Sequence, residues 1–450
     1  MEVVTTYQDL VEVGENEKER LDFVRSCIAK HMASGERKTA VDAAEYYKGK
    51  NVTIRKYTKL LYTVKGNAVP DNFSANHKLS SNFFFRFVTQ QNQFLLGNGV
   101  NWNEKETVEK TLGNDFDMRL KDAGLQALIG GVSFLFFNLD HVEVFKESEF
   151  VPLYDEMTSA LRAGIRFWQI QRDKPLIATL YEQDGYTSYE WVDGDGRITA
   201  EKRPYKMQVE RTAVDDAEIV DFSNYEGFPI VPLFANDMKQ SEFVGIRESI
   251  DCYDLVRSGF ANDLDDASQI YWTITNAGGM DDDVSLAQFI ERMKVVKAAV
   301  LDDNARAESH TIEVPYAARK ELLETLRKDM YRDYMALDTE QIAGGAITAT
   351  QILAAYEPMN SKADQYEHCI LDAIYKLLKI AGIENENPTF TRSYLVNKQE
   401  EVQNVLNSAA FLPEDYVTKK LLTLLGDGDK ADEIIRQMEI DGFDRMNEEG

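Results

Sequence analysis

The sequence has little cysteine, no long hydrophobic run and too few basic residues to balance its acids. The cysteines Cys27, Cys252 and Cys369 lie far apart and form no CxxC pair, which excludes a zinc knuckle and a disulfide framework. The longest largely apolar run, Ala127–Phe137, is about half of the roughly 20 residues that a membrane helix needs. The acidic, polar stretch Met1–Arg20 does not have the pattern of a signal peptide. We therefore expect a soluble protein from a reducing, cytoplasmic compartment.

The shortage of positive charge excludes two further classes of protein. Lys and Arg number 50 against 77 Asp and Glu, which gives a formal net charge of −27. Affinity for nucleic acid comes mainly from basic side chains that release counterions from phosphates, so this chain is not a nucleic-acid clamp. A polybasic membrane binder is excluded for the same reason. The apolar fraction of 44% and the charged fraction of 28% are ordinary for a globular protein, and 450 residues correspond to about three domains.

Hydrophobic periodicity predicts a helical N-terminal part. Helices are expected at Glu17–Ala33, Val41–Tyr47, Asn76–Leu96, Glu104–Leu112 and Phe116–Ile129. The third should begin at Asn76 as its N-cap, and its five phenylalanines indicate a deeply buried face. Gly130-Gly131 should end the last of these helices.

The hydrophobic period changes after Gly131, which predicts a β-rich stretch. Strands are expected at Val132–Leu139, Val142–Phe145, Phe167–Gln171, Ile177–Glu182, Thr187–Val192, Ile198–Val209 and Phe228–Leu233. The turn residues Asp193–Gly196 are a strong hairpin signal. The surrounding segment superficially resembles a calcium loop, but aligning Gly196 with the invariant glycine puts Trp191 first and Lys202 twelfth, where acidic ligands are required.

Helix returns in the C-terminal half of the chain. Helices are expected at Glu242–Asp266, Leu286–Met293, from Pro315 to about Leu337, and over 347–381, where Pro358 should introduce a kink. The glycines and aspartates of Tyr271–Asp283 do not suit a helix, and Val295–Leu301 is an expected strand. The remaining stretch, Asn387–Gly450, is expected to hold one strand and two or three short helices.

The sequence carries no recognisable catalytic motif, metal-ligand spacing or cofactor loop. The five histidines form no paired spacing, GxSxG is absent, and no complete P-loop or dinucleotide loop occurs. We therefore expect no enzyme activity and no cofactor. One alternative stays open, a metal-dependent phosphoesterase or nuclease built on acidic clusters. These clusters are Asp263/Asp265/Asp266, Asp281/Asp282/Asp283 and Asp302/Asp303, although such groups are usually solvated faces in so acidic a chain.

Six short segments carry a resemblance through their order along the chain. They are Tyr46–Lys50, Asn76–Gly99, Asp122–Asn138, Phe228–Asp237 (FPIVPLFAND), Glu242–Asp265 and Ile347–Ala355 (ITATQILAA). Each segment is short and by itself would match many unrelated sequences. The resemblance depends on their occurring in the same order over residues 40–440. It resembles the tailed-bacteriophage portal proteins, in the group typified by the portal of Bacillus phage SPP1.

The resemblance implies an α+β, mainly helical subunit of several domains that forms a closed ring, usually a dodecamer, around a central channel. The implied parts are a wing (1–237), stem helices (241–268 and 316–337), a clip (269–315), a tunnel loop (338–346), a long kinked helix (347–381) and a crown (382–450). Such a ring sits at one capsid vertex of the virion and is assembled in the bacterial host cytoplasm. Double-stranded DNA is packaged and ejected through it without sequence-specific binding. The implied partners are the terminase motor, the head–tail adaptor, and the major capsid and scaffolding proteins, with no membrane.

The resemblance also implies site residues. The DNA-facing tunnel loop comprises Asp338, Thr339, Glu340, Gln341, Ile342, Ala343, Gly344, Gly345 and Ala346. The clip residues expected to contact terminase or adaptor are Tyr271, Trp272, Asp281, Asp282 and Asp283.

Charge agrees with the tunnel-loop assignment. No Lys or Arg lies between Asp333 and Lys362, so the loop would not bind passing phosphates and stall the DNA. The pair Gly344-Gly345 allows unusual backbone angles. Two plainer interpretations stay open, namely a surface linker between helices at 338–346 and a buried Trp272 at a helix end.

Overall fold

The computed structural model describes residues 5–62, 67–71, 75–171, 173–211, 217–267, 271–275, 306–310, 315–340, 349–394, 398–426 and 428–438. The chain divides into two compact units, Met1–Thr391 and Arg392–Gly450. The first unit mixes helices with several antiparallel sheets, and the second is helical in its described part. The helix and strand expected at Leu286–Met293 and Val295–Leu301 lie outside the described residues.

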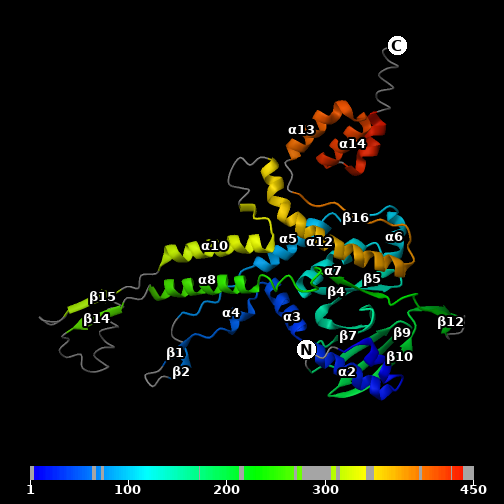
Figure 1. Ribbon diagram of the computed structural model, residues 1–450, viewed down its shortest axis with the longest axis horizontal. Coiled ribbons are helices and arrows are strands. Elements are labelled where there is room, and N and C mark those ends of the chain that lie inside the picture. The colour runs from blue at the N-terminus through cyan, green and yellow to red at the C-terminus, as the bar shows by residue number, and fades with distance from the viewer. Residues whose placement is uncertain are drawn as a thin grey trace, which may run out of the picture. The chain divides into compact units, whose positions relative to one another are not determined.

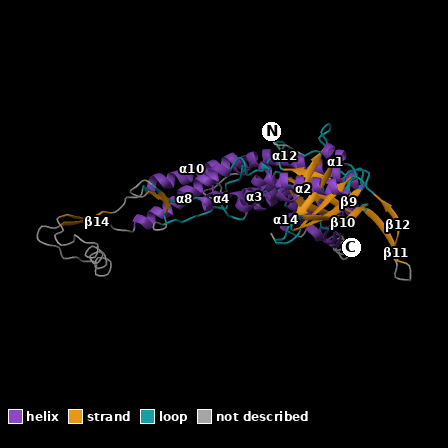
Figure 2. Ribbon diagram, turned by 90° about the horizontal axis from the view of Figure 1, so that it is seen from below, coloured by secondary structure: helices purple, strands orange, loops and turns teal. Residues whose placement is uncertain are grey.

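The N-terminal helices pack on a five-stranded antiparallel sheet, with α2 beside β9 and β10 in Figure 2. The helices are α1 (Tyr7–Val13) and α2 (Glu17–Ala33). The strands are β6 (Phe150–Tyr154), β7 (Leu161–Trp168), β8 (Leu176–Glu182), β9 (Gly185–Val192) and β10 (Asp195–Arg203), paired in the order β10-β9-β8-β7-β6. Val24 and Ile28 of α2 share a buried cluster with Leu180 and Tyr189 of the sheet. The prediction of α2 is confirmed to the residue.

The predicted hairpin between β9 and β10 is confirmed. Asp193 and Gly194 both have positive φ, at 49° and 97°, as a two-residue type I′ turn requires. The predicted strand Ile198–Val209 is wrong as a single strand. It divides into β10 and β11 (Lys206–Arg211) around Pro204, whose missing N–H cannot continue a ladder. Strand β11 pairs instead with β12 (Ala217–Ser223).

The strand predicted at Phe167–Gln171 is also largely wrong, because β7 begins at Leu161 and ends at Trp168. Arg162, Gly164 and Arg166 interrupt its apolar pattern, and β6 before it was not predicted at all. Gly164 is buried against the ring of Phe150 on β6, where a Cβ atom would lie 2.1 Å from the ring. The close approach of these two strands explains the glycine.

The larger core surrounds a three-stranded sheet of β13 (Ile230–Phe234), β4 (Val132–Asn138) and β5 (His141–Lys146), in that order. Helices α3 (Gly35–Tyr47), α5 (Phe83–Leu96), α7 (Phe116–Gly130) and α12 (Ala349–Ala381) contribute to the same buried cluster. Smaller elements are α4 (Val52–Lys56), β1 (Leu60–Tyr62), β2 (Ala68–Pro70), β3 (Val100–Asn101), α6 (Lys105–Leu112), the 3-10 turn η1 (Glu147–Glu149) and β16 (Thr389–Phe390). Helix α3 begins earlier than predicted because Ser34 caps it by accepting from the Arg37 N–H at 3.2 Å.

The start of α5 differs most from the prediction. The helix begins at Phe83 rather than near Asn76. The backbone N–H groups of His77, Leu79 and Ser81 donate to side chains of α8 (Arg247–Ala267), namely Asn262 at 2.6 Å, Ser258 at 3.0 Å and Asp254 at 2.9 Å. This extended segment therefore satisfies its backbone on another helix, at positions one turn apart, instead of within its own.

Helices α8 and α10 (Tyr316–Tyr334) lie side by side and run antiparallel (Figure 1). Strands β14 (Tyr271–Thr275) and β15 (Arg306–His310) form a two-stranded antiparallel ladder beyond the end where α8 finishes and α10 begins. Pro358 lies inside α12, which changes direction along its length in Figure 1, as the sequence predicts.

The second unit contains α13 (Lys398–Ser408), η2 (Ala409–Phe411), α14 (Glu414–Leu425) and η3 (Gly428–Lys430). The expectation of short helices after 387 is confirmed. Within the part of the chain that the structure describes, no helix combines the length and the apolarity needed to cross a lipid bilayer.

Candidate functional site: the helix pair and the base of the following loop

The segment before α8 is fixed to the core by hydrogen bonds to carbonyl groups of α7. Ser241 donates its hydroxyl to the Ile129 carbonyl at 2.5 Å, and the Glu242 N–H donates to the Leu128 carbonyl at 3.1 Å. Gly131 has φ +94°, and a Cβ atom there would lie 2.8 Å from the Ser241 nitrogen. The predicted helix start at Glu242 is therefore wrong, because residues 242–246 form turns against α7 and α8 begins at Arg247.

The middle of α8 is held by a buried carboxylate. Asp254 is fully buried and accepts hydrogen bonds from Asn51 Nδ2 at 2.9 Å and from the Ser81 N–H at 2.9 Å. Burial raises the pKa of this carboxyl, while these hydrogen bonds oppose the rise. One turn earlier, Tyr46 donates its hydroxyl to Asp251. These polar contacts fix the rotation of α8 relative to the N-terminal helices.

The acidic cluster at the far end of α8 is occupied by basic partners. Asp263 forms an ion pair with Arg319 of α10, and Asp265 lies 2.5 Å from His77 Nε2. Among the residues that the structure describes, no group of three His, Cys, Asp or Glu side chains is placed to hold a metal ion. The clusters at 281–283 and 302–303 lie outside those residues. The phosphoesterase or nuclease alternative therefore has no support.

Helix α10 ends at a residue with left-handed backbone geometry. Met335 has φ +62°, and the Ala336 N–H returns to the Tyr331 carbonyl at 2.9 Å. The next residue, Leu337, makes two reciprocal hydrogen bonds with one side chain of α5. Gln90 Nε2 donates to the Leu337 carbonyl and Gln90 Oε1 accepts from the Leu337 N–H, each at 3.1 Å. The chain leaving α10 is thus clamped to the core.

The first residue of the predicted tunnel loop is anchored by charge. Arg327 Nη1 on α10 donates to Asp338 Oδ2 at 2.9 Å and lies 3.1 Å from Glu340 Oε2. The Asp338 side chain is only 5% exposed, whereas that of Glu340 is 74% exposed. Asp338 also accepts from the Glu340 N–H at 3.2 Å. The Arg327–Asp338 pair therefore marks the point where the loop leaves the core.

A lysine from α12 joins the segment before α8 to the end of α10. Lys362 Nζ lies 2.7 Å from Glu242 Oε2, donates to the Tyr334 carbonyl at 3.0 Å, and sits 3.4 Å from the centre of the Tyr334 ring. Burial lowers the pKa of Lys362, and the nearby Glu242 carboxylate opposes that change. On its other face the Tyr334 ring stacks on Phe87, with ring centres 4.8 Å apart, and its hydroxyl donates to Gln91.

The predicted site residues are only partly within the structure. Asp338, Thr339 and Glu340 lie at the anchored base, and 341–346 lie outside the described residues. Tyr271 and Trp272 lie on β14, paired in register with His310 and Ser309, whereas 281–283 again lie outside the described residues.

Sequence reasoning missed the residues that hold the loop base and the end of α10, namely Gln90, Arg327 and Lys362. Gln90 contacts Leu337 and Lys362 contacts Tyr334 across more than 20 residues of sequence, so no local spacing could have indicated them. The absence of nearby basic residues after Asp333 was the one local signal. It indicates that a nearby basic partner of Asp338 must precede Asp333, where Arg327, Lys328 and Arg332 are candidates. The structure shows that the partner is Arg327.

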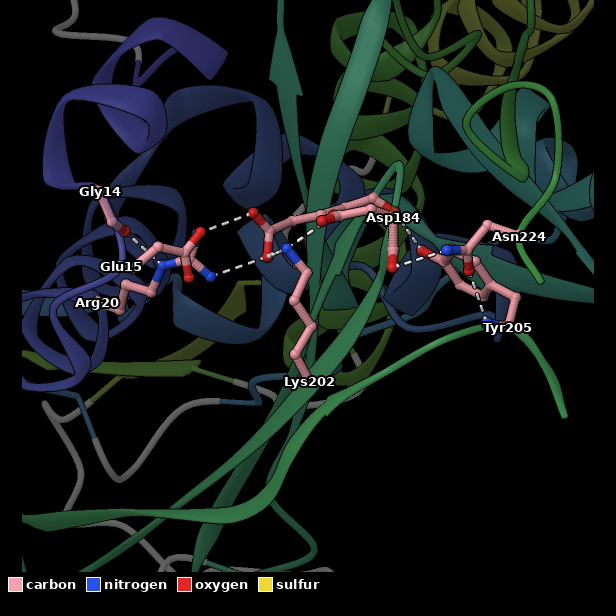
Figure 3. Close-up of polar contacts among 8 residues, drawn as sticks. Gly14, Glu15, Arg20, Asp184, Lys202, Tyr205 and Asn224 are labelled. Carbon is pink, nitrogen blue, oxygen red and sulfur yellow. Dashed lines mark hydrogen bonds and ion pairs between the residues drawn. The ribbon is translucent and has the colours of Figure 1, made fainter. Parts of the chain in front are cut away.

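A second polar cluster, drawn in Figure 3, is structural. Arg20 Nη1 and Nη2 donate to the two oxygens of Glu182 at 2.9 and 3.0 Å, and Arg20 Nε donates to the Gly14 carbonyl at 2.6 Å. Lys202 Nζ lies 3.3 Å from Glu182 and 2.7 Å from Asp184. Both oxygens of the buried carboxylate are engaged by Arg20, so this cluster fastens α2 to the sheet.

Comparison with known proteins gives a consistent result. A family model described as phage portal protein, SPP1 Gp6-like, matches residues 29–439. A portal protein of Clostridium phage phiCD119 is 25% identical over 432 residues, which cover 89% of this chain and 92% of that protein. A portal protein of Bacillus phage SPP1 is 22% identical over 423 residues, which cover 88% of this chain and 82% of that protein. Among solved structures, a chain of the neck of a native GTA particle computed with C12 symmetry is similar with a TM-score of 0.44 and 11% identity, covering 76% of this chain and 89% of that one.

Proposed function

Because the chain belongs to the SPP1 Gp6-like family of phage portal proteins and has a portal function, we propose that copies of it close into a ring around a channel for DNA. The ring is expected to hold twelve subunits, to occupy one vertex of the capsid, and to serve in packaging and later ejection. Its interfaces would be heterologous, since each subunit presents different surfaces to its two neighbours.

The observation that carries this proposal at the level of residues is the clamped departure of the chain at Asp338. The Arg327–Asp338 pair and the Gln90–Leu337 hydrogen bonds fix the base of the proposed tunnel loop, 338–346. No Lys or Arg occurs between Asp333 and Lys362. A rigid base without basic residues beyond it suits a loop that faces moving DNA, since basic residues would bind the phosphates.

The remaining parts follow the same scheme. Residues 1–237 form the proposed wing, α8 and α10 the proposed stem, and 382–450 the proposed crown. The β14–β15 ladder, which carries Tyr271 and Trp272, belongs to the proposed clip, 269–315. We place the contacts with the terminase motor and the head–tail adaptor there. The capsid and scaffolding proteins would contact the ring in the virion, and assembly would take place in the host cytoplasm.

The acidic balance of the chain supports a conduit rather than a DNA-binding ring. At −27 per subunit, the protein repels a polyanion, and in saline this repulsion acts over only about 8 Å. DNA would thus be kept off the wall without being barred from the channel. No step of this function requires catalysis by the ring.

Negative-stain electron microscopy of the purified full chain, combined with a solution mass measurement, tests the proposal. Rings around a central hole, with a mass near twelve subunits, are the expected result. A compact dimer without a hole at the same protein concentration would contradict it.

A further inference from the structure

A groove of about 440 Å³, open to solvent, follows the outer strand β13 of the three-stranded sheet. Its walls come from β13 and the residues before it, from the turn that joins β6 to β7, and from the last turns of α12. All of these elements belong to the first unit. The proposed portal function assigns no role to this groove.

Basic side chains predominate on the groove walls, although acids outnumber bases by 77 to 50 in the whole chain. In the described part of the chain the lining includes one acid, Glu226, and four bases, Arg162, Lys239, Lys376 and Lys379. Two of these bases are already engaged. Lys376 pairs with Asp372 at 2.6 Å, and the Lys239 ammonium lies 4.7 Å from the centre of the Phe234 ring.

The other two bases are available to an anionic partner. Arg162 and Lys379 are exposed, and neither forms an ion pair with a residue that the structure describes. Next to them, Leu161, Pro232 and Ile380 are half-buried, so each leaves part of its apolar side chain open to the groove. Two unpaired cations beside an apolar wall are complementary to a carboxylate that is joined to an apolar group.

The backbone of β13 excludes one way of filling the groove. The Phe137 N–H of β4 donates to the Pro229 carbonyl, and the Ala235 N–H donates to the Gly131 carbonyl. Hydrogen bonds alternate along an antiparallel strand, so Pro232 lies at a position whose backbone turns away from β4. Proline has no N–H to pair with an added strand there. We therefore expect an occupant to bind through its side chains rather than by extending the sheet.

One exposed segment of the second unit has the complementary chemistry. Phe411 is 89% exposed, more than any other aromatic residue that the structure describes. Glu414 and Asp415 follow in the first turn of α14, both exposed, and neither pairs with a basic residue in the described part of the chain. Pro413 lies between the aromatic ring and the two acids and fixes the backbone of this turn. An apolar group and two unpaired negative charges are thus presented together.

We propose that the groove binds the segment Phe411–Asp415 of a second copy of this chain. Phe411 lies against the apolar wall, and the carboxylates of Glu414 and Asp415 pair with Arg162 and Lys379. Since the groove and the segment are different surfaces, the contact is heterologous, and each copy gives one segment and receives one. This contact rests on the proposed assembly of copies, but a peptide that carries the segment detects it without any ring.

Fluorescence anisotropy with a labelled peptide of residues 409–417 (AAFLPEDYV) tests the contact. The peptide is titrated with the full chain carrying Phe411→Ser, so that the chain's own segment does not compete. We expect saturable binding with a Kd of about 0.1–1 mM, which weakens as salt is added. A peptide with Glu414→Gln and Asp415→Asn, and another with Phe411→Ala, should each bind about tenfold more weakly.

A charge exchange shows whether the two basic residues meet the two acids directly. Arg162→Glu with Lys379→Glu should weaken binding of the natural peptide by about tenfold or more. The same variant should bind a peptide with Glu414→Lys and Asp415→Lys, and this recovery also shows that the variant is folded.

The matched control reverses two exposed bases that do not line the groove. Lys105→Glu with Arg119→Glu changes the net charge by the same amount, and the two side chains are 64% and 45% exposed. This control should keep the affinity for the natural peptide within about twofold. No saturable binding, equal binding of the uncharged peptide, or unchanged affinity in the charge-reversed groove would each overturn the proposal.

Photo-cross-linking identifies which copy supplies the segment. The full chain with Phe411→p-benzoylphenylalanine is prepared unlabelled and nitrogen-15-labelled, and the two forms are mixed before irradiation. We expect cross-linked peptides that join position 411 to the groove residues and combine both isotopes. Cross-links that always combine peptides of the same isotope would show that the segment folds back on its own chain, which contradicts a contact between copies.

Discussion

Arg327 and Asp338 form an ion pair of 2.9 Å in which the carboxylate is almost wholly buried and the guanidinium is about one quarter exposed. The pair joins the middle of α10 to the chain that leaves its end, across the αL residue Met335. Because a buried carboxylate is stable only with its partner in place, the geometry of the loop base depends on the position of α10. Movement of that helix would be transmitted directly to the proposed tunnel loop.

Replacing Arg327 should therefore destabilise the protein. In Arg327→Gln the Asp338 carboxylate, with a side chain 5% exposed, loses its counter-charge, and we expect a loss of about 1–3 kcal/mol in the free energy of unfolding. Urea denaturation measures it. Arg332→Gln is the matched control, since Arg332 is 73% exposed and should cost about 0.5 kcal/mol or less. Equal losses in the two variants would show that the Arg327–Asp338 pair contributes no more to the free energy of unfolding than an exposed ion pair.

Gly131 should be far more sensitive to substitution than a glycine within α8. Gly131→Ala must place a Cβ atom 2.8 Å from the Ser241 nitrogen at φ +94°, and we expect a loss of about 2–4 kcal/mol. Gly259→Ala meets nothing within 4 Å inside α8 and should instead stabilise by about 0.5–1 kcal/mol. Thermal unfolding of both variants measures the contrast. A tolerated Gly131→Ala would contradict the close approach of this turn to the start of α8.

These examples show where sequence reasoning succeeded. Helix α2 was predicted to the residue because one apolar stripe packs on one sheet, and the Asp193-Gly194 turn because its chemistry allows few conformations. The family was predicted because the order of segments is a property of the whole chain. Each of these signals is contained in the sequence pattern itself.

The failures have a common physical cause in long-range contacts. Residues 76–82 were predicted as the start of a helix, but the N–H groups of His77, Leu79 and Ser81 find acceptors on α8, more than 170 residues later. Gln90 holds Leu337 and Lys362 holds Tyr334 from distant parts of the sequence. His31 likewise meets the Glu147 carbonyl across 116 residues. None of these partners can be identified from local spacing.

The stability of the protein should fall between pH 6.5 and 8 because of Glu147. Burial raises the pKa of this carboxyl from 4.5 to about 8, so the folded state holds a proton that the unfolded state releases, and stability falls as pH rises through this window. Burial lowers the pKa of His31 from 6.5 to about 4, which has the opposite sign and acts only below pH 6.5. Between pH 6.5 and 8 we therefore expect Glu147 to lower the free energy of unfolding by about 1–2 kcal/mol.

The measurement is the free energy of urea unfolding at several pH values from 6.5 to 8. Glu147→Gln cannot ionise, so its curve should be flatter than that of the wild type. Glu149→Gln should keep the wild-type slope. Parallel curves for the wild type and Glu147→Gln would contradict the burial of this carboxyl.

Shortening the proposed tunnel loop should separate assembly from DNA handling. Deleting Gln341–Ala346 removes residues beyond the anchored base but keeps Asp338 and its partner Arg327. We expect normal ring yield by electron microscopy and a strong loss of packaged or retained DNA in a complementation assay. Lys376→Gln, which alters one exposed side chain outside the loop, should package normally. Wild-type DNA packaging by the deletion variant would contradict the assignment of 338–346 as the tunnel loop.

Lys362 should contribute more to stability than its single charge suggests. It neutralises Glu242, whose side chain is 13% exposed, caps the Tyr334 carbonyl and covers the Tyr334 ring. Lys362→Met keeps the apolar stem but leaves the buried carboxylate without its counter-charge, with only the hydrogen bond from Asn236 Nδ2 at 3.0 Å remaining, and we expect a loss of about 2–4 kcal/mol. Lys376→Met, which removes a lysine 53% exposed on the same helix, should cost about 0.5 kcal/mol or less.

A double variant distinguishes the unpaired charge from lost packing. The loss of stability in Lys362→Met has one source in the Glu242 carboxylate, which is left without a counter-charge. If this source dominates, adding Glu242→Gln should restore part of the free energy of unfolding, because burying a neutral amide requires far less free energy than burying a charge. If the losses in the two single variants add up in the double variant, the contact of Lys362 with the Tyr334 ring and carbonyl accounts for the loss in Lys362→Met. In that case Tyr334→Leu should reproduce most of the loss from Lys362→Met. Since Glu242 lies before α8 and Tyr334 lies at the end of α10, the outcome tells which of these two segments Lys362 mainly stabilises.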